Sequence, residues 1–325
     1  MKRGHGMKLS AIVIGAILAT FILASQAFAW GSATHAYIDD RLGKQGPLRN
    51  LNEIYGGMAT DVFNYLFVNL DWLNYLYVET HYDHNMVVWK KADTILEKAV
   101  AFGFVSHNGY TGADATAHGS YDYTLQIEPT GWVIAKTVDM AKKPEVQTLL
   151  NGILLGEPDN IAAATYELCH TFVESAVDLL LAQQDRSLGG KISVAALART
   201  HEFPNLLVKA YARGFAKRFG VEYAMAVQTV RSAESEFRRN MVSYGLALAQ
   251  DAEIAKGLIA EQLVALAPAF LGAYGVELSD DADLAVLSNN LIDEAIDLCQ
   301  EDYLTAVEGT ILFVKSNLPH MGRSY

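Results

Sequence analysis

The chain has 325 residues, 51% of them hydrophobic, and a formal net charge of −12 at pH 7. So acidic a chain is not expected to bind nucleic acid through a broad basic surface. It has two cysteines, Cys169 and Cys299, which excludes a disulfide framework as the main source of stability, and the lack of a CxxC pair argues against a thiolate zinc site. The two cysteines are compatible with one bridge or with two buried thiols.

Residues 1–29 are typical of a secretory signal peptide. Three basic residues lie at or before the start of an apolar run over 9–23, and AFA at 27–29 has the small residues of a cleavage site. We therefore expect a cut after Ala29, an exported protein that is secreted or periplasmic, and Trp30 as the first residue of the mature chain. An uncleaved N-terminal anchor is the alternative, although the run is short for a membrane-spanning helix.

Beyond residue 29 the pattern predicts a mostly helical chain, because apolar residues recur at spacings of three and four. In chain order, we expect helices over 89–101, 160–182, 193–200, 205–219, 221–248 and 284–315. The pattern over 284–315 also fits two helices. Asp159 could cap the helix over 160–182. Only 121–127 alternates as a strand does. The expected fold class is all-α, a helical bundle.

Two polar segments that contain glycine, 183–190 and 272–283, are predicted to be loops. The first divides the mature chain into a core over 30–185 and a helical C-terminal region over 186–325, to which the sequence assigns no role. Between the loops, 258–271 is strongly apolar, but a glutamate and a proline interrupt it. We therefore predict a buried helix there rather than a membrane span.

The histidines are unevenly distributed, since six of the eight beyond residue 29 lie between residues 35 and 170. His170 and Glu174 are four residues apart inside the strongest predicted helix. Both side chains therefore lie on one helix face and could converge on one cation. An ordinary surface pair has the same spacing, so this motif needs support from other candidate ligands.

A second set of candidates lies in SHNGYTGADATAHG, residues 106–119. Asp114 and His118 repeat the spacing of four, and His107 precedes them with two glycines between it and Asp114. Three potential ligands within twelve residues favour a metal site held by nitrogen and oxygen. A glycine-rich loop with incidental polar residues is the alternative.

Further candidates lie upstream. Asp61 follows a Gly-Gly pair, and His81 and His84 are three residues apart, so that either or both could face one site. An N-terminal Trp30 would offer an α-amine and a carbonyl oxygen that chelate a metal as a five-membered ring. His35 is close enough in sequence to add an imidazole. The alternative for the tryptophan is that it only packs its ring.

Together these residues resemble the ligand pattern of the zinc-dependent phospholipase C family and of its relatives, the S1/P1-type nucleases. The shared pattern is a mature N-terminal Trp, a His, an Asp, a His, an H…D…H cluster and a final HxxxE or HxxxD. Here it is carried by Trp30, His35, Asp61, His81, His107, Asp114, His118, His170 and Glu174. WGSATH is most similar to the nuclease branch, whereas HTFVESAVDLLL and THYDHNMVVW are most similar to the phospholipase branch. The resemblance covers about residues 30–185.

The sequence departs from the family in one spacing. The family commonly has three residues between the first His and the Asp of the cluster, whereas six separate His107 from Asp114. On an unbroken helix, seven positions correspond to about 10 Å along the axis. That is too far for two ligands of one zinc, whose bonds are about 2.0–2.2 Å. We therefore predict that the helix breaks or bulges near Gly109 to Gly112.

The resemblance implies an all-α fold with a polar cleft that holds three zinc ions. It also implies the ligands of each ion: His81, His107 and Asp114 for the first, His118, His170 and Glu174 for the second, and Trp30 and His35 for the third, with Asp114 bridging. Asp61 would be a further ligand or would orient the attacking water. Zinc lowers the pKa of bound water to about 7, which supplies hydroxide for attack on phosphorus.

The expected function is that of a zinc-dependent hydrolase of phosphoric ester bonds, a phosphodiesterase of phospholipase C type. Its substrate would be a phospholipid or another phosphodiester, reached through transient contact with a membrane surface. One alternative is an S1/P1-like nuclease or nucleotidase on the same site, without a stable nucleic-acid complex. The other is a protein of this fold that binds metal without turnover. The aromatic residues of 61–78 fit either a substrate cleft or the helix core.

Overall fold

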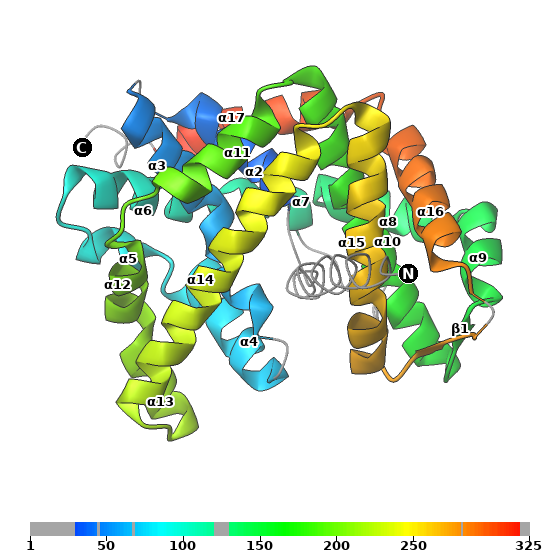
Figure 1. Ribbon diagram of the computed structural model, residues 1–325, viewed down its shortest axis with the longest axis horizontal. Coiled ribbons are helices and arrows are strands. Elements are labelled where there is room, and N and C mark those ends of the chain that lie inside the picture. The colour runs from blue at the N-terminus through cyan, green and yellow to red at the C-terminus, as the bar shows by residue number, and fades with distance from the viewer. Residues whose placement is uncertain (1–29, 44–45, 67–68, 120–129, 281, 319–325) are drawn as a thin grey trace, which may run out of the picture.

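The computed structural model describes residues 30–43, 46–66, 69–119, 130–280 and 282–318, and this part of the chain is almost entirely helical (Figure 1). The predicted all-α fold class is confirmed. The predicted signal peptide and the predicted strand over 121–127 lie outside the described residues. Two short segments, β1 (Leu154–Leu155) and β2 (Glu277–Leu278), form one antiparallel pair.

The helical elements follow one another along the whole described chain. In order they are α2 (Ser32–Leu42), α3 (Pro47–Met58), η1 (Ala59–Tyr65), α4 (Leu70–Val78), η2 (Glu79–Asp83), α5 (Met86–Lys91), α6 (Ile95–His107), α7 (Ala113–His118), α8 (Trp132–Lys142), α9 (Pro144–Asn151), α10 (Pro158–Gln184), α11 (Leu188–Ala198), α12 (Phe203–Leu207), η3 (Val208–Ala212), α13 (Arg213–Phe219), α14 (Tyr223–Leu248), α15 (Ala252–Ala273), α16 (Leu284–Cys299) and α17 (Tyr303–Asn317). Of the irregular turns, η1 is a 3-10 helix, and η2 and η3 are π-helices.

The predicted helix over 160–182 is confirmed as α10, but Asp159 does not cap it. Glu157 precedes the first helical residue without a side-chain cap bond, and Asp159 lies in the first turn. The predicted helix over 89–101 is wrong, because the chain breaks into α5 and α6. Thr94 accepts a hydrogen bond from the Glu97 amide, and Glu97 bonds back to the Thr94 amide. This capping box starts a new helix and satisfies amides that would otherwise lack partners.

The pattern over 284–315 forms two helices, α16 and α17, which was one of the two expected outcomes. The predicted loop over 183–190 is shorter than expected, because α11 begins at Leu188. Gly189 therefore lies inside a helix, where a Cβ atom would come within 2.5 Å of the Gly245 carbonyl oxygen. The glycine lets α11 pack closely on α14 instead of marking a loop.

Glycine also allows α3 and α6 to cross in close backbone contact. A Cβ atom on Gly56 would lie 2.0 Å from the carbonyl oxygen of Val100, and one on Gly103 would lie 2.0 Å from that of Glu53. Real Cβ atoms do not approach so closely, so the crossing needs glycine on both helices. It brings the end of α3, and η1 after it, next to the end of α6.

The helices of the C-terminal region pack on the same hydrophobic core as those of residues 30–185. Helix α14 runs across the middle of the molecule and contacts η1, while α15 and α16 lie beside α10 (Figure 1). A buried ion pair between Arg199 and Glu234, to which the Tyr55 hydroxyl donates, joins α3 to α14. Residues on both sides of position 185 therefore share one core.

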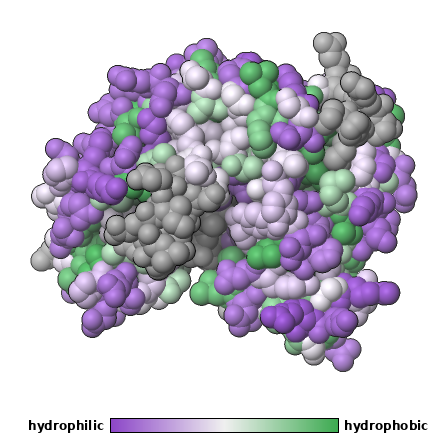
Figure 2. Space-filling model, turned by 180° about the vertical axis from the view of Figure 1, so that it is seen from behind, coloured by the Kyte–Doolittle hydropathy of each residue, from purple (hydrophilic) through white to green (hydrophobic). Residues whose placement is uncertain are grey.

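Helix α15 contains the apolar segment 258–271, which was predicted to be a buried helix. The helix is present, but only 33% of its most apolar window is buried, so the prediction of burial is wrong for most of it. By length and composition alone α15 could span a membrane, a test that core helices of soluble proteins also pass. The face of the molecule in Figure 2 is mainly hydrophilic, with small hydrophobic areas between polar side chains.

Candidate metal centre

Three predicted ligand residues, Asp61, His81 and His107, form one buried group. The Nε2 atom of His81 lies 3.2 Å from Oδ1 of Asp61, and Nε2 of His107 lies 3.9 Å from the same oxygen. One ligand atom from each residue lies within 4.8 Å of the others, and each side chain is at most 1% exposed. The Gly-Gly pair before η1 and the α3–α6 crossing bring these residues together.

The two histidines of this group are oriented by their second ring nitrogen. Nδ1 of His107 lies 2.7 Å from the Gly57 carbonyl oxygen, and Nδ1 of His81 lies 3.0 Å from that of Tyr77. A carbonyl oxygen only accepts, so Nδ1 carries the proton and Nε2 presents its lone pair towards Asp61. Burial lowers the pKa of both histidines, which keeps them neutral. This is the arrangement of a metal-ligating histidine.

A second group consists of His118, His170 and Glu174. The Nε2 atoms of the two histidines are 3.3 Å apart, and Nε2 of His170 lies 3.1 Å from Oε1 of Glu174. His170 and Glu174 share a face of α10, as their spacing of four predicted. Glu167, one turn earlier, lies 3.7 Å from Nδ1 of His170. It thereby holds the ring with Nε2 towards the group.

The chain between the two groups contains the six residues that separate His107 from Asp114. Helix α6 ends at His107, and the Asn108 side chain accepts hydrogen bonds from the amides of Tyr110 and Thr111. Helix α7 then begins after Gly112, so the predicted break in the helix is confirmed. The turn buries the side chain of Asp114, which is 1% exposed, and places its Oδ1 atom 3.5 Å from Nδ1 of His118. Asp114 thus contacts the second group while its charge also acts on His81 and His107.

His35 lies against the first group. Its ring stacks on that of His107, with 3.7 Å between the centroids and 9° between the planes. Burial lowers the pKa of His35 well below its usual value, and His107, His81 and His118 lower it further. Two stacked imidazoles of this kind remain neutral, and neither ring nitrogen of His35 has a hydrogen-bond partner. His35 is therefore available to a metal ion.

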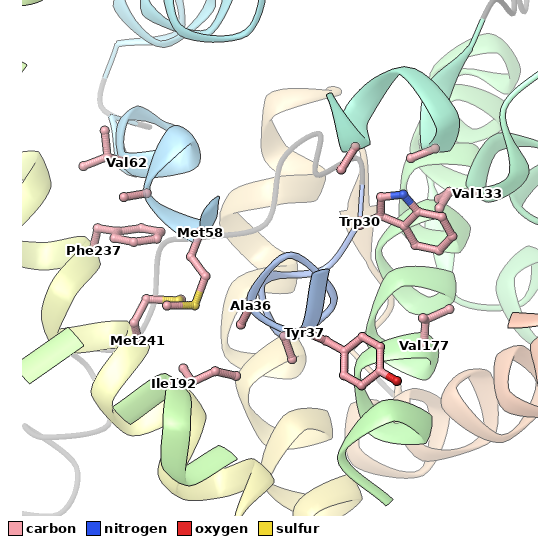
Figure 3. Packing of buried hydrophobic residues seen from close by; sticks show 14 of the residues in the cluster. Trp30, Ala36, Tyr37, Met58, Val62, Val133, Val177, Ile192, Phe237 and Met241 are labelled. Atoms are coloured by element: carbon pink, nitrogen blue, oxygen red, sulfur yellow. The ribbon is translucent and has the colours of Figure 1, made fainter. Parts of the chain in front are cut away.

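Trp30 is fully buried, and its side chain is held in place by two contacts. Its ring stacks on Trp132 at 5.3 Å, and its indole nitrogen donates to the Thr116 hydroxyl at 3.3 Å. Figure 3 shows the ring pointing towards Val133 of α8, with Val177 of α10 nearby. The residues before Trp30 lie outside the described part, so chelation by a free α-amine remains a prediction. His84, by contrast, is 56% exposed, pairs with Glu79 at 2.7 Å and belongs to neither group.

The unsatisfied polar atoms of the described residues concentrate here. Eleven buried side-chain nitrogen or oxygen atoms have no hydrogen-bond partner. Seven of the eleven belong to predicted ligands: both nitrogens of His35, Oδ2 of Asp61, Nε2 of His107, both carboxylate oxygens of Asp114 and Oε1 of Glu174. Oε1 of Glu174 still faces Nε2 of His170, and Oδ1 of Asp114 faces Nδ1 of His118. Each of the other five atoms costs about 1–3 kcal/mol when left unpaired. A cation that accepts their lone pairs would remove this cost.

Without a metal ion, burial favours the protonated forms of two carboxylates of the site, Asp61 and Glu174. Burial raises the pKa of Asp61 to about 7 and that of Glu174 to about 8. For His170, burial acts to lower the pKa, but Glu174 and Glu167 outweigh it and raise the value to about 10. A bound cation would displace these protons, as metal binding generally does. The donors present are imidazole nitrogen and carboxylate oxygen, which suit zinc.

Sequence reasoning missed the residues that orient the ligands. Glu167 lies three residues before His170, and Asp178 lies four after Glu174, so both spacings were visible in the sequence. The carbonyl groups of Gly57 and Tyr77 could not be found in this way, because any residue supplies a carbonyl. Their role depends on how the helices cross.

Comparison with known proteins gives no family for the chain. No protein-family model matches it. No curated protein and no solved structure matches it either. The function therefore has to be argued from the residues that the fold brings together.

Proposed function

We propose that the protein is an exported, zinc-dependent phosphodiesterase of phospholipase C type. The observation that carries the proposal is the set of buried, unpartnered ligand atoms on the residues that the family pattern predicted. Two groups of these residues could each hold a metal ion. A chain without metal would gain nothing from gathering unpaired lone pairs in its core.

Zinc is the ion that fits these donors best. A tetrahedral zinc with bonds of about 2.0–2.2 Å separates its ligands by roughly 3.4 Å. Pairs of ligand atoms lie 3.2 and 3.9 Å apart in the first group, and 3.1 and 3.3 Å apart in the second. The third ion of the proposal would be held by Trp30 and His35, with Asp114 shared. His35 supports this part, since both of its nitrogens are buried and unpartnered.

The residues of the site would have different roles in phosphodiester hydrolysis. Zinc bound here would supply a water of pKa about 7 and neutralise charge on the phosphate. Asn64 donates to Oδ1 of Asp61 at 3.0 Å, which leaves Oδ2 free to accept a proton from an attacking water and orient it. His118 is 17% exposed, the largest value in the two groups, so the phosphate is expected to approach from its side.

A nuclease or nucleotidase is the second candidate, and three tyrosines favour it. Tyr77 stacks on His81 at 4.0 Å, Tyr82 contacts Tyr77, and Tyr110 contacts Tyr82 at 5.4 Å with 63% of its surface exposed. Such rings could stack on a base of a strand end. The acidic net charge counts against long nucleic acids. The phospholipase proposal therefore stands first.

The test begins with elemental analysis of the exported protein after removal of residues 1–29, alongside the His170→Ala variant. We expect two to three zinc ions per chain, and fewer in the variant because it removes a ligand of the second group. The next measurement compares hydrolysis of phosphatidylcholine with that of single-stranded DNA. Zero or one zinc ion in the wild-type protein would favour the alternative of a protein of this fold that binds metal without catalytic turnover. Preferred cleavage of DNA would favour the nuclease.

A further inference from the structure

We propose that Asp178 is a positioning residue that holds residues 30–35 against the metal-binding side of α10, and that Tyr244 of the C-terminal region holds Asp178. The inference rests on the proposed zinc site. It assigns a role to a carboxylate that is not itself a ligand. It also gives residues 186–325, which no motif covers, a part in the site.

Asp178 continues the row of ligands on α10. His170, Glu174 and Asp178 are spaced by four residues, so their side chains leave one face of the helix in successive turns. All three are buried, and Asp178 is 1% exposed. The first two face the second metal group, whereas the third faces the start of α2.

The carboxylate of Asp178 caps α2 from another helix. It accepts hydrogen bonds from the amides of Ala33 and Thr34, each at 2.8 Å, and from the Thr34 hydroxyl at 2.6 Å. The first amides of a helix have no partner within the helix. Gly31 stands at the N-cap and has no side chain to offer, so Asp178 supplies the missing acceptor. Its negative charge also faces the positive end of the helix dipole.

Gly31 is required by this contact. A Cβ atom on it would lie 2.4 Å from Oδ2 of Asp178, although its backbone angle (φ −57°) would suit any residue. The absence of a side chain on Gly31 therefore allows the backbone to approach Asp178 closely. It lets the backbone next to Trp30 lie directly on α10, one turn beyond Glu174.

Two contacts from the C-terminal region complete the arrangement. The Tyr244 hydroxyl of α14 donates to Oδ2 of Asp178 at 2.6 Å. On α17, the Thr310 hydroxyl lies 2.7 Å from that of Thr116, which accepts the indole N–H of Trp30. Helices α14 and α17 thus fix both the start of α2 and the ring of Trp30, which precedes it.

The position of His35 depends on this arrangement. Its amide bonds to the Gly31 carbonyl at 3.1 Å, so its ring position follows from where α2 begins. If the start of α2 moves, Trp30 and His35 move away from His107. His170 and Glu174 stay in place, because they belong to α10. Loss of the Asp178 carboxylate should therefore weaken the ion held by residues 30 and 35 and leave the second group intact.

The test measures zinc content at a fixed free zinc concentration, by elemental analysis after equilibrium dialysis of the exported protein. Asp178→Asn keeps the shape of the side chain and removes its charge. We expect it to hold one zinc ion fewer than the wild type, or to bind its weakest ion about tenfold less tightly, the usual size of such an effect. His35→Ala should show the same loss, and the double variant should lose no more than either single one.

Glu234→Gln is the matched control, since Glu234 is a buried carboxylate whose partners Arg199 and Tyr55 are not proposed metal ligands. It should lower the melting temperature and leave zinc binding unchanged. Tyr244→Phe removes one hydrogen bond to Asp178 and should weaken the same ion to a smaller degree. It also tests the proposal if Asp178→Asn does not fold.

The outcomes separate the two proposals. If wild-type protein binds zinc and Asp178→Asn and Tyr244→Phe bind it equally well, Asp178 is only a helix cap and the inference is wrong. The proposed function would then be untouched. If the wild-type protein binds no zinc, the proposed function fails and the inference fails with it.

Discussion

In each of the two groups that could hold a metal ion, the protein holds one ring nitrogen of a histidine and leaves the other facing the neighbouring candidate ligands. Gly57 and Tyr77 do this through carbonyl groups for His107 and His81, whereas Glu167 does it through a carboxylate for His170. A carboxylate behind an imidazole raises the basicity of the ligand as well as fixing its orientation. The His170 ring should therefore depend on one replaceable side chain.

The Glu167→Gln variant tests this dependence. We expect zinc affinity to fall about tenfold, because the amide orients His170 less well and carries no charge. Far-UV circular dichroism should not change. The exposed Asp159, at the start of the same helix, provides the control Asp159→Asn, which should bind zinc as the wild type does. Equal affinities in the two variants would show that Glu167 is an ordinary surface residue.

The raised pKa values of the site predict how the metal-free protein responds to pH. Glu174 titrates at about 8 and His170 at about 10 in the folded chain, above their usual values. The folded state then binds more protons than the unfolded state, so stability falls as pH rises through this range. Below pH 6.5 the histidines with lowered pKa, His35, His81 and His107, act in the opposite direction.

Above pH 6.5 the opposing effect fades as the histidines of the unfolded chain lose their protons, so the metal-free protein should lose stability as the pH rises towards 8. Thermal unfolding after chelation, at several pH values in this interval, measures it. Zinc should abolish the decline, because the ion replaces the protons. A melting temperature that rises with pH in the metal-free protein would contradict the assignment.

At the scale of helices, the crossing of α3 and α6 builds the first metal group. Gly103 has no room for a side chain, since a Cβ atom would lie 2.0 Å from the Glu53 carbonyl oxygen. Gly103→Ala should therefore cost about 1–3 kcal/mol of unfolding free energy. It should also weaken zinc binding, because it separates Asp61 from His107.

Gly257→Ala is the control for this prediction. Gly257 lies inside α15 with open space where its Cβ atom would be, so alanine should stabilise the helix by about 0.5–1 kcal/mol. Urea unfolding and zinc titration of both variants measure the two effects. A Gly103→Ala protein with wild-type zinc affinity would mean that the crossing does not position the ligands.

The two groups of candidate ligands show what the sequence could and could not predict. The pairing of His170 with Glu174 follows from helix geometry, because a helix fixes residues four apart. The pairing of Asp61 with His107 has no such local basis, and it was expected only through the resemblance to a family. The break at Thr94 was predictable from T-x-x-E, since Thr94 and Glu97 form a capping box. The orienting carbonyl groups were not, because they depend on tertiary packing.

For the molecule as a whole, the metal groups lie inside the core and are bounded by helices from both ends of the chain. Tyr244 and Thr310 act from the C-terminal region, while Arg199 and Glu234 join that region to α3. Apart from His118, the ligands of the two groups are at most 5% exposed, so the helices would have to separate to expose them. Any ion bound there is therefore bound by the folded chain far more tightly than by the unfolded one.

This difference predicts a large effect of chelation on the whole protein. A ligand at 100 times its dissociation constant stabilises the folded state by about 2.7 kcal/mol, and each further ion adds its own contribution. Dialysis against a chelator should lower the melting temperature, and added zinc should restore it in proportion to the logarithm of its free concentration. In His170→Ala the response should be smaller, because the second group is incomplete and the first remains. A melting temperature independent of zinc would mean that the buried, unpartnered ligand atoms are not a zinc site, and the function proposed from them would have to be abandoned.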